Sequence, residues 1–132
     1  MTRRQLRTHV FKLLYLTFFY TKEEMEEQTR LYLEEAVPEP EEQDLEYIRD
    51  RLLKITEMLP EIDRVIDEKS ESWKINRMNY VDLSIIRLAY YEIFHDEDIP
   101  MAVAINEAVE IAKIYGGEDS SSFVNGILAK LL

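Results

Sequence analysis

Apolar residues recur at steps of three and four along nearly the whole chain, and this period most constrains the fold. The steps are regular from Leu45 to Leu59, from Asn79 to about Phe94 and from Met101 to Tyr115. This spacing gathers apolar side chains on one face of an α-helix. No segment shows the sustained alternation of apolar and polar residues that marks a half-buried strand. The sequence therefore predicts an all-α protein of about seven helices.

Capping and helix-breaking residues divide the first half of the chain. Thr21 is followed three residues later by Glu24, which is the spacing of a capping box and predicts a helix that runs to about Ala36. Pro38 and Pro40 then break the chain, because neither can donate a backbone hydrogen bond. These signals predict separate helices before and after residues 37–41.

The second half contains three further connectors. We expect Trp73, with Ile75 and Met78, to form a turn or short helix that fills the core. Gly116 and Gly117 should end the helix that starts at Met101, in the left-handed conformation that glycine adopts at little cost. Ser120 or Ser121 is expected to cap the last helix.

The composition excludes several classes of function. The chain has 132 residues, no cysteine, three glycines and two histidines. Thiol catalysis, cysteine-ligated metals and a glycine-rich phosphate loop are therefore excluded, and no nucleophile–base pair can be assembled. We predict one domain over residues 1–132, with no catalytic residue, no cofactor and no metal site.

The charge is distributed unevenly. Sixteen Lys and Arg against 27 Asp and Glu give a net charge of −11, yet residues 1–22 hold five bases and no acid, so residues 23–132 carry −16. Arg3, Arg4 and Arg7 fall within about 100° of one another on a helical wheel. A short basic arm on an acidic body is suited to local contact with a polyanion.

The same arm does not fit a targeting or membrane segment. The apolar run from Val10 to Tyr20 contains Lys12 and has no small-residue cleavage site after it. It is also shorter than the roughly 20 residues that cross a bilayer. We expect a cytoplasmic protein with no membrane partner.

The last third and the amino end carry a family signature. The C-terminal part reads Arg87-Leu88-Ala89-Tyr90-Tyr91-Glu92, Ile99-Pro100, Ala104-Ile105-Asn106-Glu107-Ala108, Glu118-Asp119-Ser120 and Phe123-Val124-Asn125-Gly126, and the amino end combines Arg3, Arg4 and Arg7 with Leu14-Tyr15. In order and spacing this resembles the NusB family of transcription antitermination factors over nearly the whole chain.

The resemblance implies a fold and a function. It implies two small helical bundles in one compact domain, no enzyme activity, and binding of a short single-stranded RNA element called boxA. It also implies ribosomal protein S10 as a partner, within the elongation complex that transcribes ribosomal RNA operons, where the factor influences transcription termination. Carried onto this sequence, the RNA-binding residues would be Arg3, Arg4, Arg7, Asp119, Ser120 and Phe123. Asp82 would be a contact to S10.

The sequence departs from the family pattern at Gln5, where a further arginine often stands, and at Thr8, where glutamate is common. Other interpretations of the site residues stay open: the arginines as solvated charges, Phe123 as a core residue and Asp119 as a helix cap only. A second hypothesis is an acidic helical adaptor that binds a basic partner without touching RNA. A homodimer is also compatible with the pattern.

Overall fold

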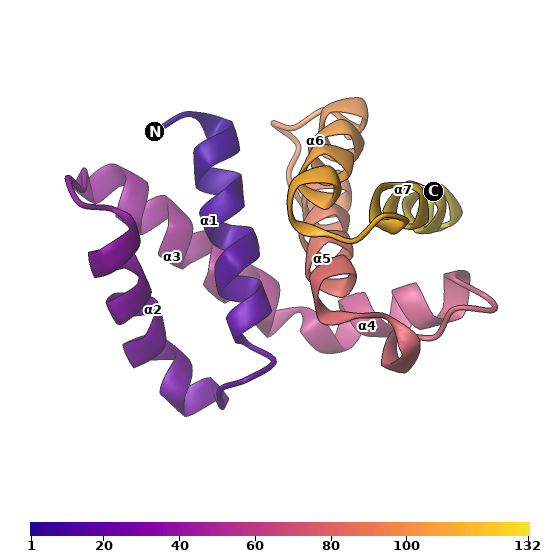
Figure 1. Ribbon diagram of the computed structural model, residues 1–132, viewed down its shortest axis with the longest axis horizontal. Coiled ribbons are helices and arrows are strands. Elements are labelled where there is room, and N and C mark those ends of the chain that lie inside the picture. Colours follow the sequence, from indigo (N-terminus) through magenta and orange to yellow (C-terminus); the bar gives the residue numbers. More distant parts are fainter. The chain divides into compact units, whose positions relative to one another are not determined.

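The computed structural model describes all residues, 1–132, and contains only helices (Figure 1). Seven α-helices and one 3₁₀ helix follow one another as α1 (Arg3–Leu16), α2 (Lys22–Ala36), α3 (Glu42–Glu57), α4 (Leu59–Lys69), η1 (Ile75–Arg77), α5 (Tyr80–His95), α6 (Met101–Tyr115) and α7 (Ser120–Leu131). The predicted all-α class and the number of helices are confirmed. No helix is both long enough and apolar enough to cross a membrane.

The chain divides into two compact units, which matches the predicted pair of helical bundles. The N-terminal unit covers Met1–Thr56 and the C-terminal unit covers Glu57–Leu132. The division falls at the last turn of α3. That the whole chain acts as one domain stays a prediction.

In the N-terminal unit, α1 and α2 run roughly antiparallel and α3 crosses them (Figure 1). Both α1 and α2 begin with a complete capping box. In the predicted one, the Glu24 backbone N–H donates to Thr21 Oγ1 at 3.2 Å and the Thr21 N–H donates to Glu24 Oε1 at 2.9 Å. The buried apolar residues of this unit include Val10, Leu13, Leu14, Leu33, Ile48, Leu52 and Ile55.

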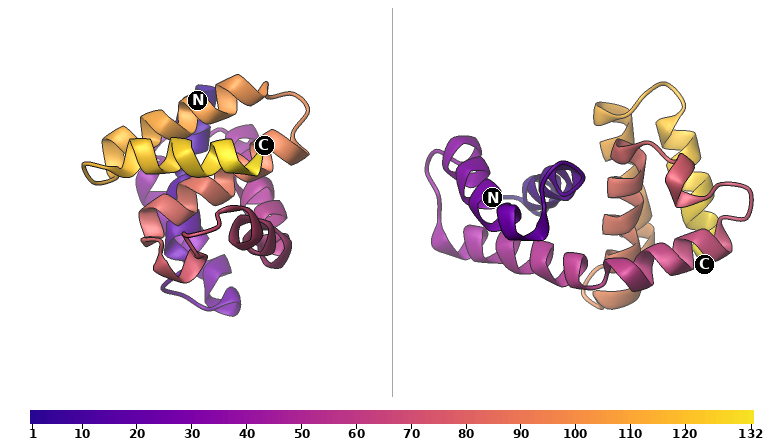
Figure 2. Two further views of the ribbon diagram at one scale, coloured as in Figure 1. Left: turned by 90° about the vertical axis from the view of Figure 1, so that its right-hand side faces the viewer. Right: turned by 90° about the horizontal axis from the view of Figure 1, so that it is seen from below.

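In the C-terminal unit, α5 is the central helix, because every residue from Asp82 to Glu92 is buried. Figure 2 shows α6 and α7 running alongside each other next to α5. One ion pair, formed by a buried arginine and a half-buried aspartate, joins α4 to α5: Arg87 donates from Nε to Asp63 Oδ1 at 2.9 Å and from Nη2 to Asp63 Oδ2 at 2.7 Å. This two-point contact fixes the crossing of the two helices in a way that a single charge contact would not.

Two predictions about the connectors are wrong. Met78 is buried as expected, but Trp73 is 49% exposed and does not fill the core. Gly116 ends α6 with φ −89° and ψ −178°, an extended conformation rather than a left-handed one. Glycine is needed there for space: a Cβ on Gly116 would lie 2.4 Å from Ser120 Cβ and 2.7 Å from the Ala112 carbonyl oxygen.

Candidate nucleic-acid interface

The first turn of α1 presents two arginines to solvent. Thr2 is the N-cap, and its Oγ1 accepts from the Gln5 backbone N–H at 3.1 Å, while Gln5 Oε1 accepts from the Thr2 N–H at 2.8 Å. Arg3 and Arg4 occupy the first two helical positions and are exposed. Gln5, which departs from the family pattern, therefore has a structural role as the second half of the capping box.

Arg3 and Arg4 stand where helix electrostatics disfavours positive charge. The N-terminus of a helix carries a partial positive charge, and each cation near it costs about 0.3–1 kcal/mol when exposed. The first turn of α1 contains no acidic residue, unlike that of α2. Two arginines in this position oppose local stability, and an external anion would offset that cost.

Arg7 does not share this exposure. Its side chain is only 7% exposed, although it was predicted to bind RNA together with Arg3 and Arg4. The helical wheel explains the difference, because Arg7 precedes Val10 and Phe11 by three and four residues and Leu14 by seven, and all three are buried. Arg7 thus lies on the buried stripe of α1.

The start of α7 is held by Ser120, which is buried. Its Oγ accepts from the Gly117 backbone N–H at 2.9 Å, and its own N–H donates to the Gly117 carbonyl oxygen at 3.1 Å. Ser120 therefore fixes the preceding loop rather than capping the helix as predicted. Its N–H group is already used, so it is not available to a phosphate.

Asp119 and Phe123 lie on the first turn of α7. Asp119 is the N-cap residue but makes no side-chain capping bond, and it is exposed. Capping therefore does not account for its carboxylate. Phe123 is half-buried, and its ring centroid lies 5.3 Å from that of Trp73 with the planes at 80°, an edge-to-face contact.

Asp82 lies in the first turn of α5 and is hydrogen-bonded to the residue that caps this helix. The N-cap Asn79 accepts from the Asp82 backbone N–H at 2.8 Å and donates from Nδ2 to Asp82 Oδ2 at 3.0 Å. Asp82 is 5% exposed, and its other oxygen, Oδ1, is buried without a hydrogen-bond partner. An unpaired carboxylate oxygen is uncommon inside a fold, and this one is enclosed by protein atoms, so it is not open to a docked molecule.

On the same helix as the arginines, His9 Nδ1 lies 2.7 Å from the Tyr32 hydroxyl of α2. Partial burial, and secondarily the charge of Lys12, lowers the pKa of His9 below its usual 6.5. The neutral imidazole is therefore the form that the fold favours.

The structure thus groups the predicted RNA-binding residues into two sets. Arg3, Arg4 and Arg7 belong to α1 in the N-terminal unit, whereas Asp119, Ser120 and Phe123 gather at the start of α7 in the C-terminal unit. Trp73, which was predicted to fill the core, is a surface residue beside this second set. The sequence did contain a signal of this exposure, because Trp73 follows a polar Ser-Glu-Ser connector and lies outside any apolar helical stripe. No group of three or more His, Asp or Glu side chains is placed to hold a metal ion.

The fold and the residues at these helix starts define a helical binding protein. Its net charge is −11, and two exposed arginines, Arg3 and Arg4, lie at its amino end. The chain belongs to the NusB family, whose model matches residues 4–132.

Its relatives confirm this over the full length. It is 50% identical over 135 residues to the transcription antitermination protein NusB of Lachnoclostridium phytofermentans, covering 100% of this chain and 99% of that one. It is 50% identical over 130 residues to NusB of Agathobacter rectalis, with 98% of each chain covered. The solved structure of T. maritima NusB matches with a TM-score of 0.86 and 40% identity, over 99% of this chain and 90% of that chain. A crystal structure of antitermination factors NusB and NusE with double-stranded RNA shares the fold, with a TM-score of 0.84 and 23% identity, covering 99% and 97%.

Proposed function

We propose that this chain is a non-enzymatic antitermination factor that binds a short single-stranded, boxA-like RNA together with ribosomal protein S10. It would act on the transcription elongation complex at ribosomal RNA operons, in the cytoplasm. Membership of the NusB family, in which relatives are named as transcription antitermination proteins, supports the general role. A fold relative described in a complex of NusB and NusE with double-stranded RNA supports an RNA and a protein as the two kinds of partner.

The observation that carries the RNA part is the placement of Arg3 and Arg4. Both are exposed at a helix N-terminus, where they oppose the helix dipole and no acid of the first turn offsets them. A residue choice that opposes the helix dipole is typical of a functional position. A phosphate at this point would be attracted both by the guanidinium groups and by the dipole.

The other candidates have different roles in this proposal. Asp119, exposed and unused as a cap, would accept hydrogen bonds from base amino groups, and Phe123 would offer part of its ring to a base. Arg7 and Ser120 are buried. We therefore assign them first to positioning, Arg7 within α1 and Ser120 at the loop before α7, and their direct contact with RNA stays a prediction.

The proposed binding of ribosomal protein S10 rests on charge complementarity. The net charge of −11 makes the body of the protein complementary to a basic ribosomal protein, which favours rapid encounter. Asp82 is buried and hydrogen-bonded to the N-cap Asn79, so we assign it first to positioning the start of α5, and its direct contact with S10 stays a prediction. Homodimer formation also stays a prediction.

The test is a titration of fluorescently labelled boxA-like RNA, with and without S10, at two salt concentrations. Two phosphate contacts from Arg3 and Arg4 give an expected salt slope of about −1.4, at roughly 0.7 per contact for single strands. We expect weak binding alone and tighter binding with S10. Retention of S10 with no detectable RNA binding in the ternary mixture would overturn the proposal and favour the protein-only adaptor.

A further inference from the structure

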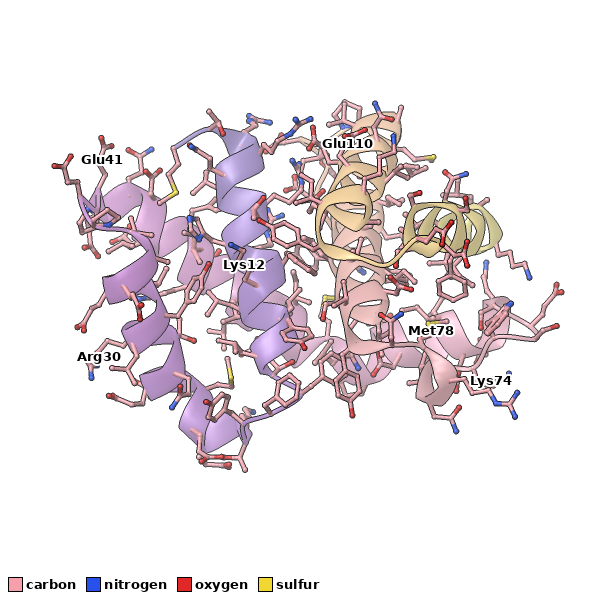
Figure 3. The ribbon with its side chains drawn as sticks, viewed as in Figure 1. Lys12, Arg30, Glu41, Lys74, Met78 and Glu110 are labelled. Atoms are coloured by element: carbon pink, nitrogen blue, oxygen red, sulfur yellow. The ribbon has the colours of Figure 1, made fainter.

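The amino end of the chain is tethered to the start of α3. The Met1 amino group donates to Asp44 Oδ2 at 3.0 Å, an ion pair between residues 43 positions apart in the sequence. The two side chains are largely shielded from solvent, at 13% and 16% exposed. Figure 3 shows Glu41 at the turn before α3, at the same end of the N-terminal unit as the start of α1. The contact therefore holds the residues that precede α1 against a neighbouring helix.

This tether lies directly before the residues proposed to bind RNA. Thr2 caps α1 by accepting from the Gln5 backbone N–H, and Arg3 and Arg4 follow Thr2 at the first two helical positions. The first turn of a helix frays easily, because its first N–H groups have no partner within the helix. Two contacts oppose fraying here, the capping box and the ion pair of Met1. Together they fix the backbone that carries both guanidinium groups.

Two acids lie in the first turn of α3, and they have different contacts. Asp44 and Glu42 are both placed where the helix dipole favours a negative charge. Glu42 is exposed and pairs with Arg49 of the same helix at 3.8 Å, whereas Asp44 reaches across to Met1. The tether to the amino end therefore distinguishes Asp44 from a neighbour of equal charge.

The charge of Asp44 by itself would disfavour RNA. A carboxylate repels phosphate, and Glu41 and Glu42 add to the negative charge at this end of the unit. If Asp44 were only a nearby charge, its removal should tighten RNA binding slightly. If it positions the arginines, its removal should weaken binding, because a frayed segment must be ordered again when RNA binds. The two roles therefore predict changes of opposite sign.

We propose that Asp44 is a positioning residue for RNA binding, which acts through the Met1 amino group by holding the start of α1 in the form that presents Arg3 and Arg4. The proposal rests on the RNA-binding function argued above and adds to it a residue outside residues 1–22. A segment that is ordered before its ligand arrives binds with a smaller loss of entropy. Such a restraint matters at this point, because cations at a helix N-terminus favour fraying.

The experiment compares Asp44→Ala with Glu42→Ala in anisotropy titrations of labelled boxA-like RNA, with and without S10. Each variant loses one acid from the first turn of α3, so the change in net charge is the same and the loss of the favourable dipole interaction is similar. Asp44→Ala should weaken RNA binding about threefold or more. Glu42→Ala should bind RNA as tightly as the parent chain or slightly more tightly. The salt slope should stay the same in all three proteins, since the phosphate contacts are retained.

Two further measurements separate positioning from a general loss of structure. The N–H groups of Gln5 and Leu6 both donate to Thr2, so their hydrogen exchange reports the order of the first turn. Exchange at these two amides should accelerate in Asp44→Ala and stay unchanged in Glu42→Ala.

A chain that lacks Met1 provides a second route to the same loss. It should lose as much RNA affinity as Asp44→Ala, and combining the two changes should add nothing further, because both remove the same contact. Intact mass confirms that each sample begins at the intended residue, and circular dichroism checks that each variant is folded.

The outcomes distinguish this inference from the proposed function. Tighter or unchanged RNA binding in Asp44→Ala would overturn the positioning role and leave the general function intact. Equal losses in Asp44→Ala and Glu42→Ala, or additive losses in the chain that lacks both Met1 and the Asp44 carboxylate, would also overturn it. Weaker binding without faster exchange at Gln5 and Leu6 would do the same. Absence of RNA binding by the parent chain under all conditions would overturn the proposed function as well.

Discussion

Replacing Arg3 by alanine should make the protein slightly more stable, and replacing Arg3 and Arg4 together should make it a weaker RNA binder. Both side chains are exposed on the first turn of α1, so little packing is lost. Relief of the unfavourable charge–dipole contact of Arg3 gives about 0.3–1 kcal/mol at low salt. For a chain of this length that corresponds to a rise in Tm of roughly 1–5 °C.

The same change should remove two phosphate contacts. We expect the affinity for boxA-like RNA to fall by about tenfold or more at 0.1 M salt, because hydrogen bonds to charged groups are worth roughly 1.5–3 kcal/mol each. The salt slope should become shallower by about 1.4. Thermal melts followed by circular dichroism and anisotropy titrations on the same samples measure both effects.

Lys22→Ala is the matched control, because Lys22 is an exposed cation at the first position of α2 in the same unit. It should affect stability in the same direction as the arginine changes and leave RNA affinity unchanged. The gain in Tm should also shrink at 0.5 M salt, since screening weakens charge–dipole contacts. A clear loss of stability in Arg3→Ala, or unchanged RNA affinity in the double variant, would refute the reasoning.

Three further predictions concern stability. Gly116→Ala should destabilise the protein by about 2 kcal/mol or more because its Cβ would meet atoms at 2.4 Å, whereas Gly126→Ala, with nothing within 4 Å, should stabilise α7 by about 0.5–1 kcal/mol. Arg87→Ala should cost about 3 kcal/mol because it leaves a carboxylate of α4 without its partner, and Arg64→Ala, from an exposed pair, less than about 1 kcal/mol. Stability should fall as the pH drops below 6.5, since the lowered pKa of His9 means that the unfolded chain binds its proton first, and His9→Gln should remove that part of the dependence.

Chemical denaturation at pH 7 measures the first two pairs, and the same curves at pH 7.5, 6.5 and 5.5 measure the third. Equal effects of the two glycine substitutions would contradict the close approach to Ser120. Equal effects of the two arginine substitutions would show that burial does not govern the ion pair. A pH dependence unchanged in His9→Gln would assign it to other groups.

The local sequence determined much of this fold. The Thr21 capping box and the breaks at Pro38 and Pro40 lie where they were predicted, because helix starts and stops depend on residues within one turn of each other. The family signature, a matter of residue order and spacing, was confirmed over residues 4–132.

Tertiary structure decided which of the candidate residues face solvent. Arg7 is a charged residue on the buried stripe of α1, and Trp73 is a large aromatic residue outside the core. Neither outcome can be obtained from residue type alone, because average preferences place arginine outside and tryptophan largely inside. Gly116 was correctly placed at a helix end, but its reason is the close approach of Ser120, which a backbone preference could not indicate.

The sequence by itself therefore settled where helices form, which segment is basic and which family the pattern matches, since each of these depends on neighbouring residues or their order. Only the folded chain brings Trp73, in the connector before η1, into ring contact with Phe123 of α7. It also places the Ser120 side chain next to Gly116, where no Cβ would fit. Burial is set by contacts between residues far apart in the sequence, and no local pattern specifies those contacts.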